Sequence, residues 1–167
     1  GIILIYSQYI NGGCIPIALA LEEMGFGRYG GKTLSLFKKS PTVEKKEKYI
    51  MITGDIKLSP NNAKELNAIT SEDNIRGEKI KVAIVSKAGA EGLDFKNIRQ
   101  VHIVDPWYNM NRIEQIIGRA VRTCSHKDLP FKERNVQIFM HGTKLNNDME
   151  AADLYVYRKA EAKSVLI

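Results

Sequence analysis

The stretch EQIIGRAVR, residues 114–122, gathers side chains that could bind a phosphate group. Gln115, Gly118, Arg119 and Arg122 are spaced i, i+3, i+4 and i+7, which places them on one face of a helix. A guanidinium stays charged and offers a planar fork of donors that suits phosphate. Glycine costs a helix about 1 kcal/mol relative to alanine, so Gly118 predicts close approach of a ligand. The alternative is a surface helix with solvated arginines.

A second group, VSKAGAEGLDF at 85–95, directly follows an apolar run. Ser86 and Lys87 supply a hydroxyl and a cation, Gly92 favours close backbone approach, and Asp94 is an acceptor suited to ribose hydroxyls. Ligands of open α/β sheets bind at the carboxyl ends of strands, where this turn is expected. By itself, the turn is equally consistent with ordinary turn chemistry.

Short apolar runs rich in isoleucine and valine predict the strands that must position these groups. They are continuous rather than alternating, which is typical of parallel strands covered on both faces. The runs lie at 2–6, 49–53, 81–85, 101–104 and 136–140. Because helical patterns lie between them, the predicted fold class is α/β, a three-layer domain with a mainly parallel central sheet and helices on both faces.

Helix signals lie between the strand signals. Pro16 and Gly25 mark the start and end of one helix, and Ser59 is the expected N-cap of another. In the helix at 111–123, Asn111 and Glu114 resemble a capping box. The expected buried stripe of that helix is Ile113, Ile116, Ile117, Ala120 and Val121. A last helix is expected at 148–163.

Composition sets wider limits. The 167 residues favour one domain, and 44% hydrophobic with 26% charged residues is typical of a globular chain. No apolar run approaches the roughly 20 residues of a membrane span. A charge of +6 is compatible with a polyanionic partner. Two cysteines give no disulfide framework, so an intracellular location is expected. Cys124 and His126 have no second ligand pair, so no metal site is expected.

Two features concern the limits of the domain. The first residue is Gly1, which runs straight into an apolar segment, and this suggests a chain cut from a longer one. The segment KKSPTVEKKEK, 38–48, is charged and has no apolar stripe, so an exposed basic loop or insertion is expected. A nucleic-acid contact or a regulatory insertion is the alternative for this segment.

In this order, these stretches resemble the second, C-terminal RecA-like lobe of superfamily 2 helicases and translocases. QIIGRAVR fits motif VI, Q-x-x-G-R-x-x-R, and SKAGAEGLDF fits motif V; IILIYSQY and MITGD are similar to motif IV and to the strand end that contacts nucleic acid. VHIVDPWYNMNRIEQ resembles the corresponding link of Swi/Snf-type translocases. IEQIIGRAVR with SQY is similar to helicase-like ATPases of large cytoplasmic DNA viruses, such as the poxvirus transcription-associated nucleoside triphosphatases. The resemblance covers roughly residues 1–142.

The resemblance implies a role for each matching residue. Arg122 would be the arginine finger that reaches the γ-phosphate of ATP across an interlobe cleft, with Arg119 on the same nucleotide. The other nucleotide-binding positions would be Gly92, Asp94, Gln115 and Gly118. Ser86 would contact a nucleic-acid phosphate, along a track that also includes Ser7, Gln8, Thr53, Gly54 and Lys87.

The resemblance also implies the cofactor and the partners. ATP with Mg²⁺ would be bound mainly by a first, N-terminal lobe of the same parent chain. The partners would be that lobe and a DNA or RNA backbone, with transcription machinery as a further candidate and no membrane. The location would be the cytoplasm or nucleus, or the host cytoplasm or virion for a viral chain.

The 167 residues lack the phosphate cradle that ATP hydrolysis needs. YGGKT at 29–33 ends like a Walker A loop, but the first glycine of that loop should stand where Phe26 is. No DExH-like box follows to hold Mg²⁺. We therefore expect a first lobe outside these residues and little or no ATP hydrolysis by this domain alone.

Three functions remain open from the sequence. The first is the C-terminal lobe of an ATP-dependent helicase or translocase. The second is a non-catalytic nucleic-acid-binding or adaptor domain with the same fold, against which the retention of Arg119 and Arg122 argues. The third is a stand-alone nucleotide-binding α/β protein, for which the incomplete Walker A pattern is poor support. Trp107 and Tyr108 could stack on a base or on adenine, but packing under the 111–123 helix is the preferred interpretation.

Overall fold

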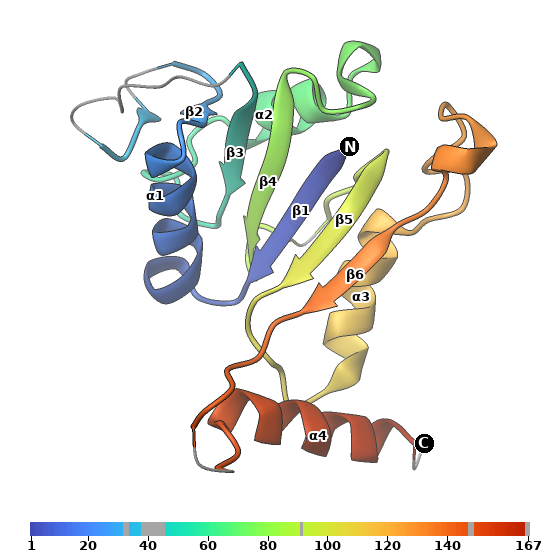
Figure 1. Ribbon diagram of the computed structural model, residues 1–167. Coiled ribbons are helices and arrows are strands. Elements are labelled where there is room, and N and C mark those ends of the chain that lie inside the picture. The colour runs from blue at the N-terminus through green and yellow to red at the C-terminus, as the bar shows by residue number, and fades with distance from the viewer. Residues whose placement is uncertain (32–33, 38–45, 91, 147–148, 166–167) are drawn as a thin grey trace.

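A single sheet of parallel strands organises the domain. The computed structural model describes residues 1–31, 34–37, 46–90, 92–146 and 149–165. Within them, six strands run in the order β2-β3-β4-β1-β5-β6, and every neighbouring pair is parallel (Figure 1). The strands are β1 Ile2–Ser7, β2 Gly27–Arg28, β3 Lys48–Ile52, β4 Ile80–Ser86, β5 Ile98–Ile103 and β6 Gln137–Met140.

Helices cover both faces of this sheet, as Figure 1 shows. On one face, α1 (Ile15–Glu23), which follows the short π-helix η1 (Ile10–Cys14), packs on β3 and β4. On the other face lie α2 (Asn62–Ile69) and α3 (Met110–Ala120). The helix α4 (Ala152–Ser164) lies beyond the edge of the sheet at which the strands have their carboxyl ends (Figure 1). The three-layer α/β prediction is therefore confirmed.

The order of the strands explains where a site can form. The chain starts at β1 in the middle of the sheet, adds β2, β3 and β4 on one side, and then adds β5 and β6 on the other. The chain therefore adds strands in opposite directions on the two sides of β1. At such a point the loops that follow neighbouring strands diverge, and ligands can bind between them. The loops after β1, β4 and β5 all leave from the same edge, because parallel strands end together.

Two predictions about the strands are wrong. The strand at 136–140 was expected to be covered on both faces, but all four residues of β6 are exposed because it is the edge strand and no helix covers it fully. The two-residue strand β2 was not predicted, since GR carries no strand signal. Within the described residues, no helix is long and apolar enough to cross a membrane.

The helix caps also differ from the prediction. Asn61 rather than Ser59 stands at the N-cap of α2, because the Ser59 hydroxyl is buried and bonds to the backbone N–H of Thr53 at 2.9 Å. Asn109 rather than Asn111 caps α3, and its side chain accepts from the Asn111 N–H. Each predicted cap is two residues from the observed one, because more than one Asn or Ser residue near the start of each helix could serve as the N-cap.

Other predicted boundaries differ as well. The last helix was predicted from 148, but α4 begins at Ala152 and residue 148 lies outside the described residues. Residues 32–33 of the YGGKT stretch and 38–45 of the basic segment also lie outside them. Gly25, predicted to end the first helix, follows α1 closely with a φ of 92°, a left-handed conformation that glycine adopts at no steric cost.

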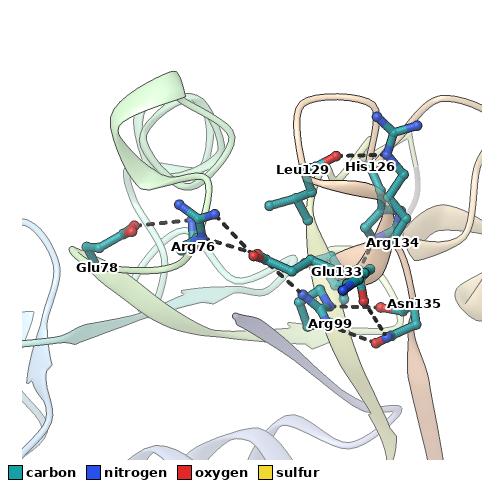
Figure 2. A network of polar contacts seen from close by, with 10 residues as sticks. Arg76, Glu78, Arg99, His126, Leu129, Glu133, Arg134 and Asn135 are labelled. Carbon is teal, nitrogen blue, oxygen red and sulfur yellow. Dashed lines mark hydrogen bonds and ion pairs between the residues drawn. The ribbon is translucent and has the colours of Figure 1, made fainter.

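A polar network ties together the loops at the amino-terminal edge of the sheet (Figure 2). The Arg76 guanidinium donates to both carboxylate oxygens of Glu133, in the 3-10 turn η4 (Phe131–Glu133). Arg99 of β5 donates to Asn135 through Nε and Nη2. Arg134 donates to the carbonyl of Leu129. Because these groups are mainly exposed, the network fixes the path from α3 to β6 more than it stabilises the fold.

A histidine pair at β6 gives a pH-dependent prediction. His102 Nδ1 and His141 Nε2 are 2.9 Å apart, and the His102 ring stacks on Phe139. Burial, and then the neighbouring His141, lowers the pKa of His102 from its usual 6.5. The folded state thus favours neutral His102, while the unfolded chain binds a proton once the pH falls below about 6.5. We expect stability to be lost as the pH falls from 6.5 through the lowered pKa.

Urea denaturation of the domain between pH 7.5 and 5 measures this effect. The His102→Gln variant should show a shallower decline in the denaturation midpoint over this range. His126→Gln is the matched control, because His126 lies in the segment between α3 and β6, outside the His102–His141 pair, and bonds to the Ile98 carbonyl. An unchanged decline in His102→Gln would contradict the assignment.

Candidate nucleotide and nucleic-acid site

The helix α3 presents only part of the predicted cationic face. Gln115, Gly118 and Arg119 lie within the helix, and Gln115 and Gly118 are exposed. Ile113, Ile116 and Ala120 are buried as expected, and Ile117 packs on the core. Apart from its own helical turn, no atom of the described residues lies within 4 Å of the position that a Gly118 Cβ would take. The surface over Gly118 is therefore open to another molecule or domain.

Arg122 is not on that helix, which corrects the prediction. The helix ends at Ala120, and Val121 leaves it with φ −111° and ψ 58°. Val121 is consequently 49% exposed instead of buried in the stripe. Arg122 follows in a turn, so its side chain takes its direction from loop contacts rather than from helical spacing.

Both arginines contact the segment that follows β4. Arg122 Nη1 lies 3.0 Å from Asp94 Oδ1, and each of these side chains is 60% exposed. Arg119 Nη1 donates to the Leu93 carbonyl at 3.0 Å. Arg119 at the end of α3 and Arg122 just beyond it thus contact two consecutive residues of the predicted ligand-binding turn. No sequence pattern predicts the role of the Leu93 carbonyl, since every residue carries a backbone carbonyl.

The turn after β4 owes its shape to glycine. A Cβ on Gly89 would lie 2.7 Å from the carbonyl carbon of Ile52, closer than packing allows, so only glycine lets this turn rest on the end of β3. The Gly89 N–H donates to the Ser86 hydroxyl at 3.1 Å. Gly92 has φ 74°, the left-handed conformation that glycine favours. The turn is therefore built against β3 before it reaches Leu93 and Asp94.

Two pockets flank this turn. The first, of about 590 Å³, is lined by residues that include Thr53, Gly54, Ala88 and Leu93. The second, of about 570 Å³, is lined by Asp94, Phe95, Lys96, Val121, Arg122, Thr123, Cys124, Ser125 and Lys127. Leu93 and Asp94 are adjacent in the chain but belong to different pockets. Of the predicted residues, Thr53 and Gly54 line the first pocket, and Asp94 and Arg122 line the second.

The second pocket is rich in cations. Arg122, Lys96 and Lys127 line it, and among its described lining residues the one carboxylate is Asp94, which is already paired with Arg122. This donor set suits the phosphates of a nucleotide and lacks a group of free carboxylates for a metal ion. Lys96 and Lys127 were missed by the sequence analysis, because single lysines near a motif carry no distinct signal.

The predicted nucleic-acid track is only partly accessible. The hydroxyl-bearing side chains of Ser7, Thr53 and Ser86 are buried. Thr53 Oγ1 is 2.7 Å from Ser59 Oγ, so this hydroxyl is used within the domain. Gly54 and Lys87 are exposed at the same edge. Of the predicted track, the backbone at Gly54 and the cation of Lys87 are the groups open to a phosphate.

The loop after β5 organises the loop after β1. Ser7 Oγ donates to Asp105 Oδ2 at 2.5 Å, and the backbone N–H of Gln8 donates to the same oxygen at 2.9 Å. Gln8 Nε2 also donates to the Pro106 carbonyl. Asp105 was missed as a site residue, although an acidic side chain directly after an apolar run is a detectable signal.

The aromatic residues after Asp105 have mixed environments. Trp107 packs against the core, as predicted, and its ring centroid lies 4.6 Å from that of Tyr108. Lys87 Nζ and the Arg112 guanidinium lie 5.0 and 5.3 Å from the Trp107 ring. Tyr108 itself is exposed. Trp107 therefore connects the turn after β4 to α3.

The parallel sheet with helices on both faces defines the class of this chain as a RecA-like α/β domain. The C-terminal part of the Fun30 ATPase domain has the same fold, with a TM-score of 0.55 at 17% identity, over 99% of this chain and 45% of that one. The family model described as "Helicase conserved C-terminal domain" matches residues 17–124. The chain belongs to this helicase C-terminal domain family.

Viral proteins are among its relatives. The NPH-I termination factor homologue of African swine fever virus is 34% identical over 174 residues, which is 89% of this chain and 24% of that protein. A predicted ATP-dependent RNA helicase of Acanthamoeba polyphaga mimivirus is 39% identical over 108 residues, 60% of this chain and 13% of that protein. The chain thus spans a quarter or less of the length of these relatives. The expected kinship with viral helicase-like ATPases is confirmed, while the similarity to the Fun30 ATPase domain shows a shared fold.

Gly118 provides a test of ligand approach. Because no atom opposes a Cβ there, Gly118→Ala should raise the unfolding free energy of the domain by about 0.5–1 kcal/mol. In the full-length protein the same methyl group should lower nucleic-acid-stimulated ATP turnover if a nucleotide or a second lobe comes close. Thermal denaturation and initial rates measure the two effects.

Gly92→Ala is the control for Gly118→Ala. Its Cβ also meets open space, but its φ of 74° makes alanine destabilising by about 1–2 kcal/mol. A stabilised Gly118→Ala protein with full turnover would contradict close approach at α3.

Proposed function

We propose that this domain is the second lobe of an ATP-dependent nucleic-acid helicase or translocase. In this proposal, ATP is bound mainly by a first lobe of the parent chain, and Arg122 meets its γ-phosphate from across the cleft. The proposal is supported above all by the position of Arg122 at the end of α3, exposed and lining a cationic pocket. Membership of the helicase C-terminal domain family supports the same assignment.

The chemistry of phosphoryl transfer gives Arg122 its task. As the γ-phosphoryl group is transferred to water, negative charge spreads over its oxygens, and a guanidinium placed there stabilises the transition state. Arg119, Gln115 and Gly118 would complete the nucleotide face, with Gly92 shaping the turn that carries Asp94. Since Asp94 is paired, Mg²⁺ would be held mainly by carboxylates of the first lobe.

The proposed nucleic-acid contacts lie on the other side of the turn. Gly54 lines the pocket at the carboxyl ends of β3 and β4, and Lys87 is exposed at the same edge of the sheet. Both would meet phosphates of a DNA or RNA strand. Ser7, Gln8, Thr53 and Ser86 would shape this edge. The three hydroxyls and the Gln8 amide would need to leave internal hydrogen bonds to touch a strand. Contacts to phosphate are independent of sequence, so binding should weaken as salt rises.

In this proposal, ATP hydrolysis is coupled to movement on the nucleic acid because the site is divided between two lobes. When Arg122 is supplied by a different lobe from the one that cradles ATP, hydrolysis requires lobe closure, and closure moves the nucleic-acid contacts of this domain. Involvement in viral transcription is a further part of the proposal, supported by the similarity to an NPH-I termination factor homologue.

The experiment that tests the proposal is nucleic-acid-stimulated ATP hydrolysis by the full-length protein, with and without Arg122→Ala. Loss of turnover with nucleic-acid binding retained is the expected outcome. Unchanged turnover would favour the alternative, a non-catalytic nucleic-acid-binding or adaptor domain that retains the helicase-lobe fold.

A further inference from the structure

Asp94 lies where two roles are possible. The resemblance places it near the ribose of ATP, as an acceptor for a sugar hydroxyl. In the structure, one of its carboxylate oxygens instead lies 3.0 Å from Arg122 Nη1. A carboxylate that orients the arginine and one that binds the sugar would affect ATP hydrolysis in different ways.

The neighbours of Asp94 hold its backbone in place. The next residue, Phe95, is almost completely buried in the core. The preceding residue, Leu93, accepts a hydrogen bond from Arg119 through its carbonyl at 3.0 Å. Asp94 is therefore fixed on both sides although its own side chain is exposed. A fixed carboxylate is suited to orienting a long, flexible partner.

Arg122 needs such a partner because of its place in the chain. It lies beyond the end of α3, so the helix does not set its direction, and its side chain is 60% exposed. A guanidinium has five N–H donors, and the pairing of Nη1 with Asp94 leaves donors at Nη2 and Nε for a phosphate. The contact can thus direct the guanidinium without blocking it.

We propose that Asp94 is a positioning residue for Arg122: its carboxylate aims the guanidinium into the pocket lined by Lys96 and Lys127, toward the γ-phosphate. This inference rests on the proposed function of Arg122. It replaces ribose recognition as the role of Asp94. The pair is exposed and polar, so its contribution is to geometry at the transition state rather than to the stability of the fold.

The test is nucleic-acid-stimulated hydrolysis by the full-length protein with ATP, 2′-deoxy-ATP and 3′-deoxy-ATP. Asp94→Asn should lower kcat about 10- to 100-fold, the size expected when a reacting group is misplaced, with little change in KM. The factor should be the same for all three nucleotides, because no sugar hydroxyl is involved. Asp94→Glu, which keeps the charge, should recover part of kcat.

A double-variant cycle completes the test. In an Arg122→Ala background, Asp94→Asn should cost nothing further, since there is no guanidinium left to orient. A full additional loss in that background would overturn the inference. The inference would also be overturned if Asp94→Asn raised the KM for ATP but not the KM for a deoxy nucleotide. That result would assign Asp94 to the ribose. Unchanged turnover in Arg122→Ala alone would instead overturn the proposed function, so the two failures are distinct.

Discussion

Replacing Arg122 by alanine is expected to lower kcat for nucleic-acid-stimulated ATP hydrolysis about 10³-fold in the full-length protein. The loss corresponds to about 4 kcal/mol of transition-state stabilisation. Alanine removes the charge that would meet the γ-phosphate but leaves the fold intact, because Arg122 is exposed and outside α3. Initial rates at saturating ATP and nucleic acid measure the effect.

Nucleic-acid affinity should hardly change in the same variant. Arg122 lines the pocket beside Lys96 and Lys127, whereas the proposed strand contacts at Gly54 line the other pocket. Fluorescence anisotropy with a labelled strand, at one fixed salt concentration, measures this affinity. A parallel loss of binding and turnover would show that Arg122 belongs to the nucleic-acid surface.

A matched control separates this effect from the loss of any surface arginine. Arg158 on α4 also forms an ion pair, with Glu150 at 2.7 Å, and is 59% exposed. Arg158→Ala therefore removes a comparable charge and a comparable contact at a residue that lines neither pocket. It should leave turnover unchanged. Arg122→Lys should recover only part of the activity, because lysine lacks the planar fork of donors.

The second large effect is expected at Gly89. Alanine there would place a Cβ 2.7 Å from the carbonyl carbon of Ile52 and 3.1 Å from the Thr53 Cα. Both neighbours are backbone atoms, so neither can rotate away. We expect Gly89→Ala to lower the unfolding free energy by about 3 kcal/mol, at the upper end of overpacking costs. Urea denaturation of the domain measures it.

The comparison for Gly89→Ala is the same substitution at Gly118, which is expected to stabilise. If the unfolding free energy falls in Gly89→Ala and rises in Gly118→Ala, the loss at Gly89 comes from the contact with β3 and not from replacing a glycine as such. Equal, small effects would mean that the turn after β4 can move away from β3. A mobile turn would also weaken the division between the two pockets.

Much of the fold could be predicted because the signals were local. Continuous isoleucine and valine runs gave β1, β3, β4 and β5 within a few residues, since a buried parallel strand must be apolar on both faces. The edge strand β6 has a similar apolar run but is exposed. An apolar run does not show whether the strand has a neighbour on both sides.

The site was predictable in composition but not in geometry. Motif spacing predicts Arg119 and Arg122 as candidate site residues, yet the end of α3 depends on Val121 leaving the helix, which spacing alone does not reveal. The buried hydroxyls of Thr53 and Ser86 likewise depend on partners that only the fold brings near. Residue types reveal what chemistry is available, and the tertiary structure determines which atoms can reach a ligand.

The boundary between the two pockets is as thin as a chain allows. Leu93 lines one and Asp94 the other, and the Cα atoms of adjacent residues are about 3.8 Å apart. A partition of one peptide unit has no length over which to act as a lever, so a shift on one side is transmitted to the other at about the same size. Under the proposed function, any large step along a nucleic acid would therefore be generated by the movement of whole lobes, while this segment would keep the two proposed sites in step.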